Sequence, residues 1–175
     1  MGKKDLDQFI KERSERREES PKTDWEQKKN EWLEFLSQFY ENIRTWLKDY
    51  EDKDIVGYNF MSVDIYEENI GQYQADKLIL TITNEQVVFE PVGTILIGDA
   101  RGRVDMKGKN GTVKFLLVDK DANGANVKIA LNTDSKESTR DKKWQWKIAT
   151  PPPSIRYLEL NSDSFSDAIL DIIND

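Results

Sequence analysis

The stretch WEQKKNEWLEFLSQFYENIRTWLKDY, residues 25–50, carries the largest apolar face in the chain. At 100° per residue, its aromatic and aliphatic side chains fall on one side of a helix. Each aromatic ring buries on the order of 150–250 Å², so a helix of this kind needs a partner surface within the fold. We therefore expect a long amphipathic helix that organises the core. Its apolar positions are Trp25, Trp32, Phe35, Leu36, Phe39, Tyr40, Ile43, Trp46, Leu47 and Tyr50.

A charged segment precedes this helix. Three apolar residues near its start, Leu6, Phe9 and Ile10, lie at helical spacing, and charged residues dominate positions 11–19. The Ser20-Pro21 step predicts a helix end, because a residue before proline is pushed out of the helical region. We therefore expect a charged helical extension in residues 1–22, followed by a single α+β domain in residues 23–175.

From position 55 onward the pattern changes to strands. Apolar and polar residues alternate in several short runs, which is typical of half-buried strands. Pro91 is expected to separate two of them, since proline cannot donate to a sheet. Ser164 is expected to begin a short C-terminal helix. The expected fold is α+β: a long amphipathic N-terminal helix packed on a mostly antiparallel, curved β-meander of about seven to nine strands, which could close into a barrel-like form.

Two Asn-Gly pairs predict β-hairpins, because a two-residue type I′ turn needs positive φ at both central positions. A turn at Asn110-Gly111 would place Met106 opposite Phe115. By the same rule, Val104 would face Leu117. The strand at 112–118 would then carry apolar side chains on both faces and be central in its sheet.

A second turn is predicted at Asn123-Gly124. It would place Val118 opposite Ile129, and Leu116 opposite Leu131. The strand that follows residues 112–118 along the chain would thus also be its neighbour in the sheet.

The absence of two residue types limits the chemistry. The chain contains neither Cys nor His, which excludes thiol nucleophiles, imidazole bases and zinc sites built on either ligand. The acidic group Asp64, Glu67, Glu68 and Asp76 has no diagnostic spacing, and no Gly-rich phosphate loop is present. We therefore expect no enzyme and no cofactor. Without an apolar leader or a run of about 18 apolar residues, the sequence predicts a cytoplasmic protein with no membrane contact.

Charge is distributed unevenly. The chain has a net charge of −7, yet residues 101–147 hold twelve Lys and Arg against six Asp and Glu, a net charge of +6. On the strand pattern, Asp99, Arg101, Arg103, Asp105 and Lys107 would share one face. An arginine pair there could hold an anion bidentately, or the acids could simply offset the bases. The candidate binding residues are Arg101, Arg103, Lys107, Trp144 and Trp146, the two tryptophans serving as stacking platforms.

A weaker candidate is a calcium loop at Asp119, Asp121 and Asn123, which match the opening of a calcium-binding sequence. Position twelve of that loop would be Ala130, where a bidentate Glu is required. An ordinary hairpin turn is the favoured interpretation, and no metal site is expected.

By exclusion, the leading functional hypothesis is a non-enzymatic intracellular protein-binding protein of inhibitor, immunity or adaptor type. Its acidic charge favours a partner with a basic surface. One alternative is an anion or nucleic-acid binder that uses residues 101–147, although the net charge makes nucleic acid the less favoured partner. A second alternative is a small-ligand carrier with a cavity between helix and sheet.

Overall fold

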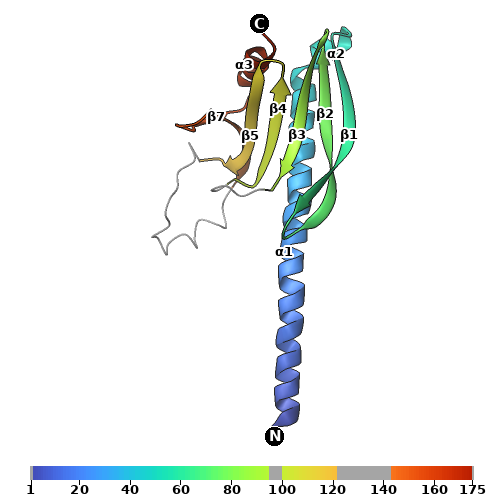
Figure 1. Ribbon diagram of the computed structural model, residues 1–175, viewed down its shortest axis with the longest axis vertical. Helices are drawn as coiled ribbons and strands as arrows, with labels where there is room; N and C mark the ends of the chain where they lie inside the picture. Colours follow the sequence, from blue (N-terminus) through green and yellow to red (C-terminus); the bar gives the residue numbers. More distant parts are fainter. Residues whose placement is uncertain (1, 95–99, 122–142, 175) are drawn as a thin grey trace.

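The structure is a computed structural model that describes residues 2–94, 100–121 and 143–174; for residues 12–24 only the backbone is described. A long helix comes first, a meander of strands follows, and a short helix ends the chain (Figure 1). The elements are α1 Lys3–Trp46, α2 Lys48–Asp52, β1 Val56–Glu67, β2 Gly71–Ile82, β3 Glu85–Gly93, β4 Gly102–Gly108, β5 Gly111–Asp119, β6 Trp144–Ala149, β7 Tyr157–Glu159 and α3 Ser162–Ile173.

The seven described strands form one antiparallel sheet in the order of the sequence, β1 to β7. This confirms the prediction of an α+β fold with an antiparallel sheet and helices. The sheet does not close into a barrel, because β1 and β7 are its two edges and do not pair with each other. None of the described helices is long and apolar enough to cross a membrane.

α1 packs its apolar face against one face of the sheet. Phe39 is fully buried, and its ring centroid lies 4.8 Å from that of Trp146, 5.1 Å from that of Phe115 and 6.0 Å from that of Phe89. Close packing of rings from four elements excludes water from the centre of the core. The aromatic helix therefore has the organising role that its sequence predicts, with Tyr50 left 50% exposed beyond its end.

α3 lies on the same face of the sheet as α1. The ring of Phe165 is 5.3 Å from that of Trp46 and 6.5 Å from that of Phe115, measured between centroids. Asn161 caps the helix: its side chain accepts a hydrogen bond from Ser164 N, and Ser164 Oγ accepts one from Asn161 N, both at 2.9 Å. The predicted C-terminal helix is thus confirmed, with its cap three residues earlier than expected.

The β1–β2 hairpin changes which face it turns to the core. Along β2 the buried residues are Tyr73 and Ala75, then Leu78 and Leu80. Since neighbouring residues of a strand point to opposite faces, this switch from odd to even positions marks a strong curvature. At the switch, the Tyr40 hydroxyl of α1 donates a 2.6 Å hydrogen bond to the Asp76 carbonyl.

Two predicted element boundaries differ from the structure. α1 includes the Ser20-Pro21 step at which a helix end was predicted. Proline removes one backbone hydrogen bond, and the helix-favouring Glu, Lys and Arg residues on both sides continue the helical backbone. Pro91 lies inside β3 rather than between two strands. The register shifts between Pro91 and Gly93, so the missing donor falls at a bulge. The strand expected after Pro91 reaches residues 95–97, which lie outside the described part.

The β4–β5 hairpin forms, but its turn is one residue earlier than predicted. Gly108 pairs with Gly111, so that Val104 lies opposite Phe115 rather than Leu117, and Met106 lies opposite Val113. The pairing shifts by two residues, which leaves every side chain on its predicted face. A tertiary contact accounts for the turn: Asn110 N donates a 2.9 Å hydrogen bond to the Ile172 carbonyl at the end of α3.

The predicted neighbour of β5 is wrong. β5 is central, as expected, but it pairs with β6, so that Leu116 lies opposite Lys147 and Val118 opposite Gln145. The Asn123-Gly124 turn and the residues predicted to face β5, Ile129 and Leu131, lie outside the described residues. The second neighbour of β5 in the sheet therefore comes from a segment more than 20 residues later in the chain.

Candidate binding pocket beside the C-terminal helix

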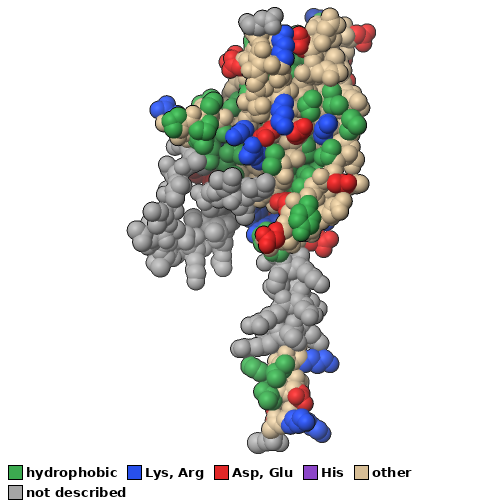
Figure 2. Space-filling model, viewed as in Figure 1, with side chains coloured by type: hydrophobic (Ala, Val, Ile, Leu, Met, Phe, Trp, Pro, Cys, Tyr) green, Lys and Arg blue, Asp and Glu red, His purple; other side chains and the backbone are tan. Residues whose placement is uncertain are grey.

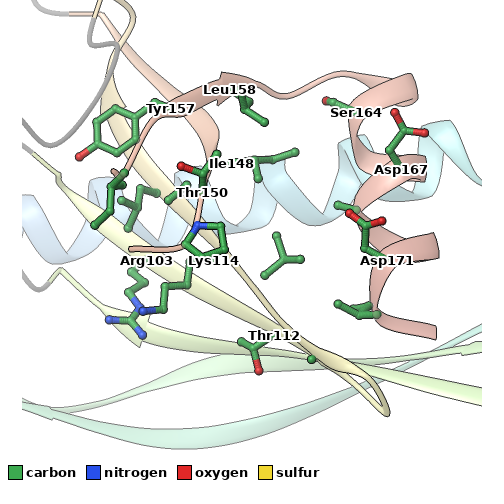
Figure 3. A pocket seen from close by; sticks show the side chains of 18 of the residues that line it. Arg103, Thr112, Lys114, Ile148, Thr150, Tyr157, Leu158, Ser164, Asp167 and Asp171 are labelled. Atoms are coloured by element: carbon green, nitrogen blue, oxygen red, sulfur yellow. The ribbon is translucent and has the colours of Figure 1, made fainter. Parts of the chain in front are cut away.

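An open pocket of about 580 Å³ lies between β5, α3 and residues 150–158 (Figure 3). It exists because β6 ends too early to cover the start of β5. Ala149, the last residue of β6, pairs with Lys114, so residues 111–113 of β5 have no partner on that side among the described strands. The chain then turns away through two prolines that line the pocket, Pro151 and Pro152, and whose rings give it a stiff wall.

The turn beside the pocket is held by its own hydrogen bonds. Thr150 Oγ1 accepts a 2.7 Å hydrogen bond from Arg156 N and donates one of 3.1 Å to the Ser154 carbonyl. Thr150 N also donates to the Arg156 carbonyl at 2.9 Å. The wall is therefore preformed, which lowers the entropic cost of binding.

Most of the pocket lining is apolar and comes from β5, from β6 with the segment that follows it, and from α3. β5 and β6 supply one side, the segment before β7 the top, and α3 the opposite side (Figure 3). A pocket of this size and character is typical of a ligand site or of a site that receives side chains from a partner. The apolar lining residues include Val113, Leu116, Ile148, Ile155, Ala168 and Ile172.

Charged groups of opposite sign stand on opposite sides of the pocket. Figure 3 shows Arg103 and Lys114 together on the strand side. Arg103 forms a bidentate pair with Asp105, with Nε–Oδ1 and Nη2–Oδ2 distances of 2.8 and 2.9 Å. The hydrogen bonds that Arg103 donates to Asp105 raise the pKa of Arg103 above its usual value. Lys114 lies directly opposite Asp105 in the register, so one carboxylate faces two basic residues and this side keeps a net charge of +1.

The negative charge on the α3 side of the pocket is not balanced by ion pairs. Asp167 and Asp171 belong to α3, which contains no Lys or Arg. Within the described part of the chain, neither carboxylate makes a hydrogen bond or an ion pair. They are four residues apart and repel each other on one helix face, and Asp171 stands near the helix C-terminus, where the dipole disfavours negative charge. A cation placed between them would relieve both effects.

The predicted basic residues are not assembled into one site. Each is paired with a carboxylate, which is the offsetting arrangement considered from the sequence. Lys107 Nζ lies 2.8 Å from Glu90 Oε2, and the hydrogen bond that Lys107 donates to Glu90 raises the pKa of Lys107. Arg101 Nη1 lies 2.8 Å from Glu31 Oε2 on α1, whereas Arg103 pairs with Asp105 on its own strand. Asp99 lies outside the described residues.

The two tryptophans have different environments. Trp146 is buried in the core, and its Nε1–H donates a 3.0 Å hydrogen bond to the Phe35 carbonyl. Trp144 is half-buried, and its ring centroid lies 4.5 Å from the Arg101 guanidinium carbon. That spacing fits a cation–π contact that ties β6 to the start of β4. Of the two predicted stacking platforms, the exposed part of the Trp144 ring is the one that remains accessible.

The other two predicted sites are placed as follows. Asp121 N donates a 3.0 Å hydrogen bond to Asp119 Oδ1, which is a turn contact, while Asn123 lies outside the described residues. No cluster of three or more Asp or Glu able to hold a metal ion occurs among the residues that the structure describes. Between α1 and the sheet, a pocket near Trp32 measures about 30 Å³, and an open pocket of about 400 Å³ lies between α1 and the residues Arg101 and Trp144. The predicted space between helix and sheet is thus a shallow surface pocket, whereas the buried centre of that interface is filled with aromatic rings.

Sequence reasoning missed the pocket because its walls come from distant segments. One signal was present: Asp163, Asp167 and Asp171 recur every four residues in a helix without a basic residue. No local sequence pattern indicated that the start of β5 lacks a described partner on the β6 side, because this depends on where β6 ends.

Comparison with known proteins gives no relative from which to infer function. The chain matches no protein-family model, and neither a curated protein nor a solved structure is significantly similar to it.

Proposed function

We propose that the protein is a non-enzymatic protein-binding protein, of inhibitor, immunity or adaptor type, and that the pocket beside α3 is its binding site. The observation that carries the proposal is the combination of an apolar pocket with two uncompensated carboxylates, Asp167 and Asp171, on one side. Apolar side chains of a partner would fill the pocket, and a basic residue beside them would pair with the carboxylates. The net charge of −7 would steer a cationic partner toward the surface.

The start of β5 supports a peptide-like occupant. Residues 111–113 border the pocket and have no described partner on the β6 side. An extended segment that runs along this edge could add main-chain hydrogen bonds to the side-chain contacts, as in other sites that extend a sheet.

The test is a binding assay with labelled peptides that share a central pair of apolar residues and differ only in flanking Lys or Glu. We expect the Lys-flanked peptides to bind and the Glu-flanked ones to bind at least several-fold more weakly. The double variant Asp167→Asn/Asp171→Asn should lose this preference. Asp163→Asn, on the same helix but outside the pocket, is the matched control. No binding, or binding that is indifferent to the double variant, would reject the site.

A small-ligand carrier is the second candidate, favoured by the pocket volume of about 580 Å³, which lies within the range of small-molecule sites. In that case, the carboxylates of Asp167 and Asp171 predict that the ligand is an apolar amine rather than an apolar acid. A thermal-shift screen of matched alkyl and aryl amines and carboxylic acids tests it. Stabilisation by the amines alone, lost in Asp167→Asn/Asp171→Asn, is the expected result for a carrier.

A further inference from the structure

The strand side of the pocket holds hydrogen-bond donors that the fold does not use. Arg103 donates Nε and Nη2 to Asp105, at 2.8 and 2.9 Å, and its Nη1 makes no hydrogen bond within the described part of the chain. Lys114 makes neither a hydrogen bond nor an ion pair with a described residue. Because Asp105 holds the guanidinium in place, an anion on this side would meet donors that are already oriented.

These donors are accessible from solvent. Lys114 is exposed, and the side chain of Arg103 is 25% exposed. Figure 2 shows basic and acidic side chains interspersed over β3, β4 and β5, with hydrophobic side chains beside them toward β7. The basic side of the pocket therefore borders its apolar lining and can contact the same ligand.

The space beside the start of β5 is closed at the basic side. Ala149 pairs with Lys114, so β6 occupies the position next to β5 from residue 114 onward. An extended segment that lies beside residues 111–113 has room for about three residues, or roughly 10 Å. It cannot continue past Lys114 in the same direction, because it would meet Ala149. A chain that ends at this point avoids the collision.

The charge at the closed side selects which end of a chain fits there. A terminal carboxylate is negative and accepts hydrogen bonds from Arg103 and Lys114, whereas a terminal ammonium group would be repelled by them. A side-chain carboxylate has the same charge, but its main chain would still have to turn away before Ala149. The closed end and its charge together favour a C-terminus.

The other end of this space is acidic. A Cβ atom at Gly111 would lie 3.9 Å from Ile172 Cγ2, so the last turn of α3 stands beside the first residue of β5. Asp171 precedes Ile172 in this turn and lines the pocket together with Asp167. A basic side chain about three residues before the terminal carboxylate would therefore reach the acidic side.

We propose that the pocket binds the C-terminal end of a partner protein, with the terminal carboxylate on Arg103 and Lys114 and a Lys or Arg, third from the end, facing Asp167 and Asp171. The last two side chains of the partner are apolar and contact the apolar lining. The inference rests on the proposed protein-binding function and names the part of the partner that is bound. These four residues are the charged groups of the pocket lining, and each then has a group of opposite sign.

Fluorescence anisotropy of the full chain with N-terminally labelled peptides tests the inference. The reference peptide ends in Lys-Leu-Leu with a free carboxyl group. An amidated form lacks the terminal charge, and a form extended by Gly-Gly keeps the charge but moves it beyond the closed end. We expect the reference peptide to bind roughly tenfold more tightly than either form, which corresponds to the loss of one hydrogen-bonded charge pair.

Variants of the protein assign the effect to each side of the pocket. Lys114→Gln should reduce the difference between reference and amidated peptides to about threefold or less, because it removes one of two cations. Lys53→Gln is the matched control: Lys53 is exposed and precedes β1, the opposite edge of the sheet, and the difference should stay unchanged. Asp167→Asn/Asp171→Asn should weaken both peptides by the same factor, because it acts on the lysine that they share.

Three results would overturn the inference: an amidated peptide that binds as tightly as the reference, an extended peptide that does so, or a Lys114→Gln protein that keeps the full difference. If amidated peptides bind equally well and still prefer Lys to Glu flanks through Asp167 and Asp171, the proposed function stands and only the terminal carboxylate is rejected. If no peptide of either kind binds, both proposals fail.

Discussion

The indole of Trp32 lies directly against Gly102, at the point where α1 meets β4. A Cβ atom at residue 102 would stand 2.3 Å from both Cε3 and Cζ3 of the ring. Trp32 is 1% exposed, and its ring centroid lies 5.8 Å from that of Trp146. A Cβ at that distance would overlap the buried ring, so the close approach of helix and strand requires glycine.

Gly102→Ala should therefore destabilise the fold. Overpacking of a filled core costs about 1–3 kcal/mol of unfolding free energy, which urea denaturation would show as a lower midpoint. Gly57→Ala is the matched control, because a Cβ there would meet nothing within 4 Å. It should change the unfolding free energy by less than about 0.5 kcal/mol. Equal midpoints for the two variants would contradict the packing argument.

A second glycine sets the position of α3. A Cβ at Gly108 would lie 2.7 Å from the Ile172 carbonyl oxygen, a backbone atom that cannot rotate away. We expect Gly108→Ala to displace the end of α3, to cost about 1–3 kcal/mol, and to speed hydrogen exchange in α3 more than in β1 and β2. Because Ile172 lines the pocket, peptide binding should weaken as well. Uniformly faster exchange throughout the sheet would show instead a global loss of stability.

Buried tyrosines predict a loss of stability in alkali. Burial, and then the 2.5 Å hydrogen bond to Glu67 Oε2, raise the pKa of Tyr73, and burial raises the pKa of Tyr40. In the unfolded chain tyrosine ionises near a pKa of about 10. Since the folded pKa is the higher one, the stabilisation is complete below pH ~10 and declines as the pH rises above it, by up to about 1.4 kcal/mol per pH unit for each tyrosine.

Urea denaturation between pH 8 and 11 measures this decline, in the range that surrounds the tyrosine pKa of about 10. Tyr73→Phe should reduce the slope of unfolding free energy against pH by as much as one proton. Tyr66→Phe, at a side chain that is 76% exposed, should keep the wild-type slope. A Tyr73→Phe protein with an unchanged slope would show that Tyr73 does not retain its proton in the fold.

The basic residues predict little affinity for nucleic acid. Arg101 and Arg103 are already paired with Glu31 and Asp105, so binding a phosphate backbone through these two residues would cost their ion pairs. We expect no change in the anisotropy of a labelled single-stranded oligonucleotide, even at low salt. Binding that weakens with salt and disappears in Arg101→Glu/Arg103→Glu would instead support the anion-binding alternative.

Local patterns predicted the elements well, because each depends on neighbours in sequence. The stripe that includes Trp32, Phe39 and Ile43 has the period of a helix, and all three residues are buried. The β4–β5 hairpin was also predicted with the correct faces. Its turn was displaced because Asn110 bonds to Ile172, a residue 62 positions later, which no local pattern contains.

At the candidate site, too, local patterns identified some of the residues but not the contacts that these residues make. Arg101, Arg103 and Lys107 could be recognised as a basic group, but not the carboxylates that pair with them, since Glu31 and Glu90 come from α1 and β3. Which residues share a strand face is a local property. Which charges meet across strands and helices is not.

The sequence by itself thus determined the aromatic helix, the antiparallel meander, the C-terminal helix and the absence of cysteine and histidine chemistry. Hydrophobic periodicity and residue type decide these features, and both are properties of short stretches. Only the tertiary structure decided that β6 pairs with β5 and ends at Ala149, and that α3 docks against Gly108. The pocket exists because of these two long-range contacts, and long-range contacts depend on packing between segments that a local pattern cannot relate.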